Sequence, residues 1–230
     1  MSDQYKNYYA HVRTDDDGHV LYQTVKEHLD GTAELCRKFA DAFGAGSEGQ
    51  IAGAYHDIGK CTKAFQDRLL NNGPKTDHST AGAIVCIKKN HISAAECIAG
   101  HHSGLQDFGS INTDRLGDPT CCGRLKKGIY EKYLEKCDIS SIDKPSMDRS
   151  DICWQNDLQK SFFTKMLYSC LVDADYLDTE RFMNGVCERG GYDSIPELLE
   201  KLKEYIKPWQ DPDNELNRLR CRILNTCLLN

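Results

Sequence analysis

Residues 157–182 read DLQKSFFTKMLYSCLVDADYLDTERF, and this stretch decides the fold class. Its apolar residues recur every three or four positions, which is the period of an amphipathic α-helix. They form one wide stripe, made of Leu158, Phe162, Phe163, Met166, Leu167, Cys170, Leu171, Ala174 and Leu177. A stripe of that width predicts a helix packed in the core of the molecule.

The same period extends through most of the remaining chain. Further helices are predicted over residues 24–43, 50–58, 62–70, 79–89, 93–100, 129–136, 195–206 and 214–229. No strand of convincing alternation is expected. Residues 103–128 are rich in Gly, Asp, Asn and Ser and have no sustained period, so they predict a long loop excursion. The expected fold class is therefore all-α, a helical bundle that carries one long loop.

Charge excludes one class of function. The 230 residues contain 29 Lys and Arg against 35 Asp and Glu, which gives a net charge of −6. A protein that wraps nucleic acid by charge alone would be strongly basic, because phosphate neutralisation supplies most non-specific affinity. Any nucleic-acid contact is expected to be local, for example at the basic groups 88–89, 124–127 and 218–222, which are otherwise solvated faces.

The sequence shows no targeting pattern, and this bears on the expected location of the protein and on the state of its cysteines. No run of about 18 apolar residues occurs, and the first residues lack a basic segment followed by an apolar one, so we expect no membrane span and a cytoplasmic protein. The twelve cysteines are then expected to be reduced thiols. A zinc cluster of Cys121 and Cys122 with Cys137 and Cys153 is an alternative, although the chain has no C-x-x-C pair.

Histidines and an aspartate carry the strongest chemical signal. His56 is followed by Asp57, His101 by His102, and single histidines stand at positions 28 and 78. Imidazole and carboxylate together suit divalent transition metals, whereas a lone histidine is more often a hydrogen-bonded core residue. Because a carboxylate has two oxygens, Asp57 is the natural bridge of a two-metal cluster. The other ligands would come from the remaining histidines and an acidic residue of the 157–182 helix.

The order of these residues resembles the HD superfamily of metal phosphohydrolases. Five segments are similar to the nuclease domain of the CRISPR-associated helicase-nuclease of type I systems: EHL at 27–29, HDIGK at 56–60, DHS at 77–79, GHHSG at 100–104 and VDADYLDTE at 172–180. The resemblance covers roughly residues 8 to 182.

The resemblance implies a set of site residues. His28, His56, Asp57 and Asp175 would hold one metal, and Asp57, His78, His101 and His102 the other. Asp175 fits the family pattern, although Asp173 lies nearer the apolar stripe, and Asp173 and Asp178 are otherwise charges at a helix edge. Lys60 would act in catalysis beside Asp57 by neutralising charge on the scissile phosphate, or else be a solvated surface lysine.

The resemblance also implies a function. We expect an HD nuclease domain over residues 1–210 that hydrolyses single-stranded DNA with two divalent metal ions, and a helix over 211–230 that leads towards a helicase domain. The nitrogen-rich site favours Mn, Co, Ni or Fe, with Mg possible. Expected partners are single-stranded DNA, an ATP-dependent helicase in cis or in trans and a crRNA-guided surveillance complex, with no membrane. The alternatives are an HD phosphohydrolase of nucleotides or cyclic nucleotides, and a non-enzymatic helical domain that binds metal or a protein.

Overall fold

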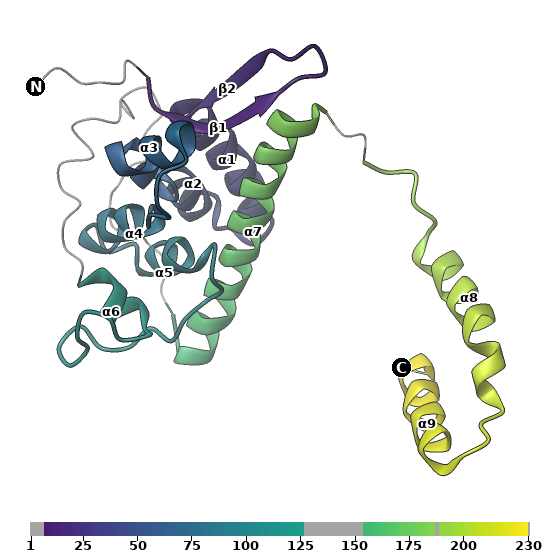
Figure 1. Ribbon diagram of the computed structural model, residues 1–230. Helices are drawn as coiled ribbons and strands as arrows, with labels where there is room; N and C mark the ends of the chain where they lie inside the picture. The colour runs from purple at the N-terminus through teal and green to yellow at the C-terminus, as the bar shows by residue number, and fades with distance from the viewer. Residues whose placement is uncertain (1–6, 127–153, 187–188, 230) are drawn as a thin grey trace, which may run out of the picture. The chain divides into compact units, whose positions relative to one another are not determined.

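The computed structural model describes residues 7–126, 154–186 and 189–229, and it confirms the expected all-α helical bundle (Figure 1). Contacts divide the chain into two compact units, Met1–Cys187 and Glu188–Asn230. The functional boundary expected at residue 210 stays a prediction. In the first unit the long helix α7 (Asp157–Asn184) packs against α1 (Val25–Ala40), α2 (Gly46–Tyr55) and α5 (Ile92–Gly100).

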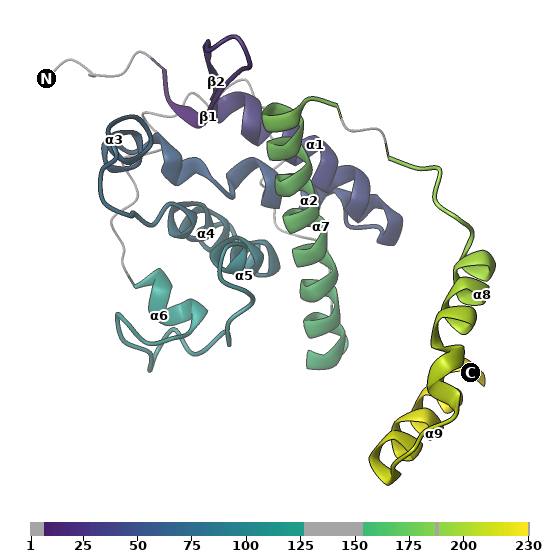
Figure 2. The same ribbon diagram turned by 45° about the vertical axis from the view of Figure 1, so that its right-hand side comes forward.

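An antiparallel hairpin precedes the helices, so the expectation of no strand is wrong. Strand β1 (Tyr9–Thr14) pairs with β2 (Val20–Thr24), and both lie beside the C-terminal end of α7 (Figures 1 and 2). Burial does not alternate along β1, and the buried residue of β2 is the polar Gln23, so the apolar residues of the hairpin show no period of two. A turn joins the two strands, and in it Asp15 Oδ1 accepts hydrogen bonds from the backbone N–H of Asp17 and of His19.

The first helix begins where the hairpin ends. Thr24 caps α1: its hydroxyl accepts from the backbone N–H of Glu27, and the Glu27 carboxylate accepts from the backbone N–H of Thr24. The buried face of α1 includes His28 among apolar residues such as Leu29 and Cys36. This packing places a histidine in the core of the bundle.

Helix α7 confirms the core prediction for its middle and corrects it for its first turns. Leu167, Leu171 and Ala174 are buried against the other helices. Leu158 and Phe162, by contrast, are 79% and 65% exposed. The expected stripe is wider than the surface that α1, α2 and α5 offer, so its N-terminal part remains uncovered among the described residues.

Shorter helices complete the first unit. They are α3 (Lys63–Asn71), α4 (Ser79–Lys88) and, within the expected loop, α6 (Cys121–Leu125). Arg124 on α6 donates to the Thr80 hydroxyl at 2.8 Å, to the Ser79 hydroxyl at 2.8 Å and to the carbonyl of Ala99, so it joins the ends of α4 and α5. The Arg124 side chain thus links two helices and is not a solvated surface charge. The helix expected over 129–136 lies outside the described residues.

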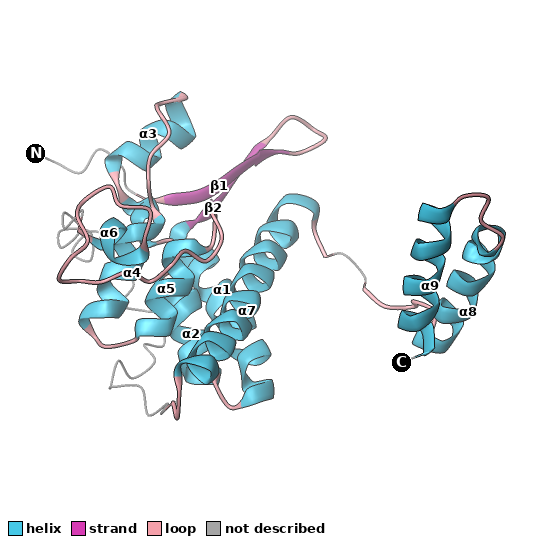
Figure 3. Cartoon of the chain, turned by 90° about the horizontal axis from the view of Figure 1, so that it is seen from below, coloured by secondary structure: helices cyan, strands magenta, loops and turns pink. Residues whose placement is uncertain are grey.

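The second unit is a helical hairpin. Figure 3 shows the chain coloured by secondary structure. Helix α8 (Ile195–Ile206) continues into a 3₁₀ turn (Lys207–Gln210), and α9 (Glu215–Leu229) returns beside it. Among the helices that the structure describes, none combines the length and the apolarity needed to cross a bilayer.

Most described cysteines are free thiols. The buried ones are Cys36, Cys86, Cys97, Cys121, Cys122 and Cys170, whereas Cys221 is half-buried and Cys227 is exposed. Cys61 forms a disulfide, so the expectation of reduced thiols is wrong for it. Sequence spacing alone does not show which sulfur atoms meet in three dimensions. Cys121 and Cys122 join no group of potential ligands in the described ranges, and Cys137 and Cys153 lie outside those ranges.

Candidate metal centre

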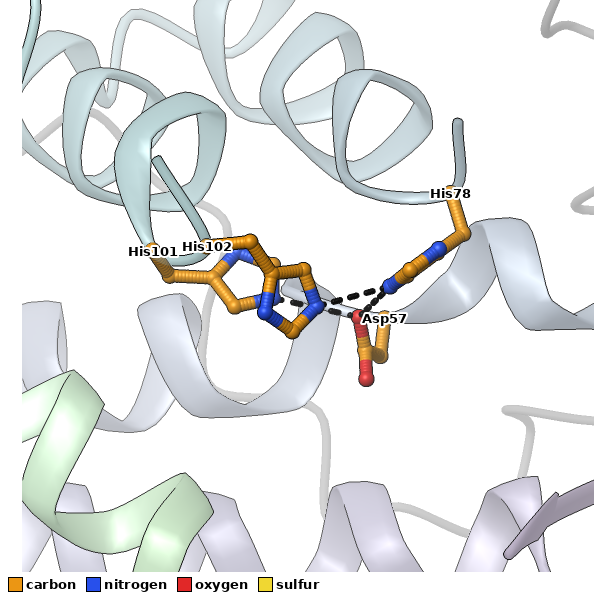
Figure 4. Close-up of side chains that lie close together, drawn as sticks. All are labelled: Asp57, His78, His101 and His102. Atoms are coloured by element: carbon orange, nitrogen blue, oxygen red, sulfur yellow. Dashed lines mark hydrogen bonds and ion pairs between the residues drawn. The ribbon is translucent and has the colours of Figure 1, made fainter. Parts of the chain in front are cut away.

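The structure brings the seven metal-binding candidates together from distant parts of the chain. They form two groups whose ligand atoms all lie within 4.8 Å of one another: His28, His56, Asp57 and Asp175, and Asp57, His78, His101 and His102. Figure 4 shows the second group, with three imidazoles turned towards one carboxylate. The two groups share Asp57.

Asp57 divides its two oxygens between the groups. Oδ2 faces the first group, at 3.5 Å from Nε2 of His28 and 3.4 Å from Nε2 of His56. Oδ1 faces the second, at 3.3 Å from Nε2 of His101 and 3.5 Å from Nε2 of His78. Such a division is what a carboxylate bridging two cations requires.

Helix ends present two of the histidines. His56 directly follows α2 and donates its Nδ1–H to the carbonyl of Gly53 at 2.8 Å. His101 directly follows α5 and donates its Nδ1–H to the carbonyl of Ile98 at 2.8 Å. The last carbonyls of a helix lack partners within it, so each histidine uses one of them to fix its ring. Both rings therefore direct Nε2 towards Asp57.

The geometry fits bound cations. Among the described residues, Oδ1 of Asp57 and Nε2 of His101 are buried without a hydrogen-bond partner, and the buried Oδ2 of Asp57 has the Lys60 ammonium as an ion-pair partner. Nε2 of His28 lies 3.2 Å from Nε2 of His56, and Nε2 of His78 lies 2.8 Å from Nε2 of His102. Such convergent lone pairs repel unless a proton or a metal ion lies between them. A transition-metal ion suits these nitrogen and carboxylate donors.

Lys60 lies inside the centre and not on the surface. It belongs to a 3₁₀ turn (Ile58–Cys61) and is 5% exposed, and its Nζ lies 2.7 Å from Oδ2 of Asp57. A Cβ atom at Gly59 would lie 2.1 Å from the carbonyl oxygen of His78. Only glycine lets this turn approach the N-terminus of α4 so closely, and that approach brings Asp57 and Lys60 beside His78.

Both carboxylates of the first group are held ionised. Burial alone would raise the pKa of Asp57, but electrostatic interactions, first with the Lys60 ammonium and then with the His56 ring, lower it well below its usual range. Burial would likewise raise the pKa of Asp175, but hydrogen bonds with His28 and His56 lower it. The centre therefore offers negative charge at neutral pH.

The histidines differ in their readiness to bind a cation. Burial would lower the pKa of His28, but the carboxylates of Asp175, Asp178 and Asp57 raise it to about 10. Burial and the neighbouring His101 lower the pKa of His102 to about 4, and burial also lowers that of His78. At neutral pH the metal-free first group holds a proton on His28, whereas His78 and His102 are neutral.

The three aspartates in the C-terminal half of α7 have different environments. Asp175 faces the first group, with Oδ1 at 3.2 Å from Nε2 of His28. Asp173 is exposed and belongs to neither group. Asp178 is 4% exposed and accepts a hydrogen bond from Nδ1 of His28 at 2.8 Å, so its interpretation as a helix-edge charge is wrong. The spacing of Leu171, Ala174 and Asp178 along one helix face was a signal for this burial.

Sequence reasoning also missed His11 and Gln23 of the hairpin. Nδ1 of His11 lies 2.8 Å from Oε1 of Gln23, and Nε2 of His11 lies 3.2 Å from Nζ of Lys60. Burial and the positive charge of Lys60 lower the pKa of His11 to about 4. These contacts bring the first strands of the chain to the edge of the centre.

One further buried histidine has a different partner. Nδ1 of His91 lies 2.8 Å from Oε2 of Glu48, and both side chains are buried. The pair joins the beginning of α2 to the beginning of α5 and belongs to neither group of ligands.

Comparison with known proteins agrees with this geometry. No curated protein matches the chain. The family model described as HD domain matches residues 25–146, which include six of the seven metal-binding candidates and Lys60. Asp175, Asp178 and the hairpin lie outside the matched range. By this match and by the His and Asp side chains that surround Asp57, the chain belongs to the HD domain family.

Proposed function

We propose that this protein hydrolyses phosphodiester bonds of single-stranded DNA with two divalent cations. Membership of the HD family indicates the broader activity, that of a metal-dependent phosphohydrolase. The observation that carries the proposal is the position of Asp57, whose two oxygens each face a separate group of ligands. Cations held by these two groups would supply Lewis-acid chemistry: they would offset charge on the phosphoryl oxygens and lower the pKa of a water molecule for attack on phosphorus.

The proposal assigns the ligands as the sequence suggests. His28, His56, Asp57 and Asp175 would hold one cation, and Asp57, His78, His101 and His102 the other. The nitrogen-rich donor set favours Mn, Co, Ni or Fe over Mg. Lys60 is the proposed catalytic cation, because its buried ammonium contacts Asp57 and can offset the charge of a phosphate held beside it.

The accessibility of the centre supports a large substrate. His28, His56 and Asp57 are fully buried, whereas His102 is exposed and Asp175 has a side chain that is 19% exposed. A substrate phosphate can reach the centre at this exposed side. A polynucleotide needs such an open approach, whereas a small nucleotide is usually enclosed in a pocket.

The partners belong to the proposal through the resemblance of the five sequence segments. An ATP-dependent helicase would supply single strands, and a crRNA-guided surveillance complex would recruit it in type I CRISPR interference, an antiviral defence in the cytoplasm. If the reaction depends on a helicase, linear duplex DNA is expected to stay intact with this chain and metal alone. The same DNA should be degraded when an ATP-hydrolysing helicase and ATP are added.

The central test is cleavage of circular single-stranded DNA with Mn, Co, Ni or Mg. Cutting of a substrate without ends, lost in Asp57→Ala and retained in the exposed control Asp173→Ala, is the expected result. Nucleoside triphosphates and cyclic nucleotides are assayed in parallel with the same preparations. Hydrolysis of these small substrates without cleavage of the circle would replace the nuclease by a nucleotide phosphohydrolase.

A further inference from the structure

We propose that the β1–β2 hairpin is part of the active centre, and that His11 and Gln23 are positioning residues for Lys60 and His28. The inference rests on the proposed function, because Lys60 and His28 are given their roles there. Both hairpin residues precede the range that matches the HD domain family. A continuous series of hydrogen bonds connects the hairpin to the centre.

The series begins at Lys60 and ends at His28. Nζ of Lys60 lies 3.2 Å from Nε2 of His11, and Nδ1 of His11 lies 2.8 Å from Oε1 of Gln23. Nε2 of Gln23 lies 2.8 Å from Oδ2 of Asp178, and the same oxygen lies 2.8 Å from Nδ1 of His28. The Gln23 side chain thus connects two residues of the proposed catalytic centre.

The chemistry of the two ends fixes the direction of every bond between them. An ammonium group only donates, so His11 must accept at Nε2 and carry its proton at Nδ1. A carboxylate only accepts, so Gln23 must direct its NH₂ group to Asp178 and its oxygen to His11. The two requirements meet at Gln23 without conflict. Neither the Gln23 amide nor the His11 ring can reverse without losing a hydrogen bond.

This fixed direction has a consequence for each end. At one end, His28 donates its Nδ1–H to Asp178 and keeps the lone pair of Nε2 for the first ligand group, as metal-binding histidines do. At the other end, His11 accepts one of the three ammonium hydrogens of Lys60 while Nζ stays 2.7 Å from Oδ2 of Asp57. Orientation of the centre therefore depends on the hairpin.

Packing holds the hairpin in this place. Gln66 on α3 donates to the carbonyl of Tyr9 at 2.9 Å and to the carbonyl of Lys60 at 2.8 Å, so it joins β1 to the turn that carries Lys60. The ring of His11 meets the ring of His28 edge to face, with centroids 4.7 Å apart. The ring of Phe182, near the end of α7, stacks on the ring of His11, with centroids 6.4 Å apart.

The first test observes the tautomer of His11 directly. The full chain is labelled with ¹⁵N-histidine, loaded with Zn²⁺ and examined by long-range ¹H–¹⁵N correlation. The expected result is a His11 ring with its proton at Nδ1. Gln23→Leu removes the acceptor of that proton and should weaken this preference, because only the Lys60 contact then holds the ring, whereas the exposed hairpin control Val20→Ala should retain it. A wild-type His11 with its proton at Nε2, or one unaffected by Gln23→Leu, would overturn the inference.

The second test measures metal binding by the absorbance of Co²⁺. Asp178→Ala is expected to weaken Co²⁺ binding by about 10- to 100-fold, the usual effect of removing a residue that orients a ligand. Asp178→Asn is expected to bind nearly as wild type, because one amide oxygen can accept both bonds that Oδ2 now accepts. The control Asp173→Ala removes an exposed carboxylate from the same helix.

The outcomes separate the two proposals. Equal Co²⁺ affinity in wild type and Asp178→Ala would refute the positioning role, and should Asp178→Ala not fold, the tautomer measurement on Gln23→Leu decides. Neither measurement uses DNA. If His11 has the expected tautomer but the protein cuts no DNA, the proposed nuclease activity is refuted and the positioning role is not. If the protein cuts DNA but His11 has the opposite tautomer, the positioning role is refuted and the nuclease activity is not.

Discussion

Oδ1 of Asp57 lies 3.3 Å from Nε2 of His101, and neither buried atom has a hydrogen-bond partner among the residues that the structure describes. Two such acceptor-rich atoms are costly to bury together unless a cation compensates them. The same holds across the centre, where imidazole nitrogens converge on one carboxylate. The centre is therefore built to hold positive charge, which allows its behaviour to be predicted without reference to a substrate.

Metal should stabilise the folded chain. A ligand that binds only the folded state adds about 2.7 kcal/mol to the free energy of unfolding at a concentration 100 times its Kd. Thermal unfolding with Mn²⁺ is expected to show a higher Tm than unfolding with EDTA, and Asp57→Ala should remove most of this difference. An equal Mn²⁺-dependent rise in wild type and Asp57→Ala would show that the ion binds elsewhere.

Metal binding should release protons. The pKa of His28 is raised to about 10 in the metal-free protein, so at pH 7 a cation has to displace the proton held there. Calorimetric titration with Mn²⁺ in two buffers of different ionisation enthalpy is expected to give a release of about one proton or more per chain at pH 7. An equal heat of Mn²⁺ binding in both buffers would mean that no proton is released, which would contradict a protonated His28 in the metal-free protein.

The metal-free protein should lose stability as the pH rises above neutrality. Because the folded pKa of His28 lies above that of an unfolded histidine, its contribution is complete below about pH 6.5 and disappears as the pH rises towards about 10. His101, whose pKa is also raised, adds to this loss. Buried thiols such as Cys86 act in the same direction, but only above about pH 8.5, the pKa of an unfolded thiol.

Urea unfolding with EDTA at pH 7.0 and 8.5 checks this expectation. The free energy of unfolding should fall between the two pH values in wild type and fall less in His28→Asn. Lowered pKa values at His78 and His102 work on the acid side, where their contribution is lost below about pH 6.5. A wild type that gains stability between pH 7.0 and 8.5 would contradict the raised pKa of His28.

Removal of the Lys60 ammonium should destabilise the metal-free protein more than the metal-bound one. Lys60→Met leaves the buried carboxylate of Asp57 without its nearest positive charge, and breaking such a buried pair costs about 3–5 kcal/mol. Bound Mn²⁺ would replace that charge, so the loss should shrink when urea unfolding is repeated with metal. Exposed Lys38→Met is the control, and equal losses with and without Mn²⁺ would show that Lys60 acts by packing alone.

Gly31→Ala should weaken both stability and metal binding. In the interior of a helix, alanine ordinarily favours the helix over glycine by about 1 kcal/mol. Here a Cβ atom would lie 2.0 Å from Oδ1 of Asp178, so the carboxylate that orients His28 has to move. Co²⁺ absorbance and urea unfolding measure the two effects, with exposed Glu34→Ala as the control on the same helix. A more stable variant with unchanged Co²⁺ binding would show that Asp178 adapts freely.

The sequence was most informative where chemistry and helical period coincide. His56, Asp57, His101 and His102 stand out because adjacent ligand residues at helix ends are unusual, and the structure brings them together. The choice of Asp175 over Asp173 needed the family pattern, since the helical wheel favours Asp173, which is exposed and lies in neither group. Periodicity does not reveal which side of α7 faces a ligand cluster.

The residues that were missed share a physical reason. His11 and Gln23 are polar residues of two short strands whose apolar residues show no period of two, so the sequence does not predict these strands. Asp178 was read as a surface charge because a buried carboxylate is rare without a partner, and its partners lie 150 and 155 positions earlier in the chain. Contacts over such separations are set by tertiary packing and leave no local pattern.

The histidines at the helix ends also bear on how small a working fragment can be. His56 and His101 are oriented by a carbonyl three residues earlier, so each takes its orientation from its own helix. His28 instead takes its orientation from Asp178, near the far end of α7. A truncated chain that stops before α7 would keep six of the ligand residues and still lack an ordered first group. The shortest segment that carries the complete centre therefore runs from His11 to Asp178.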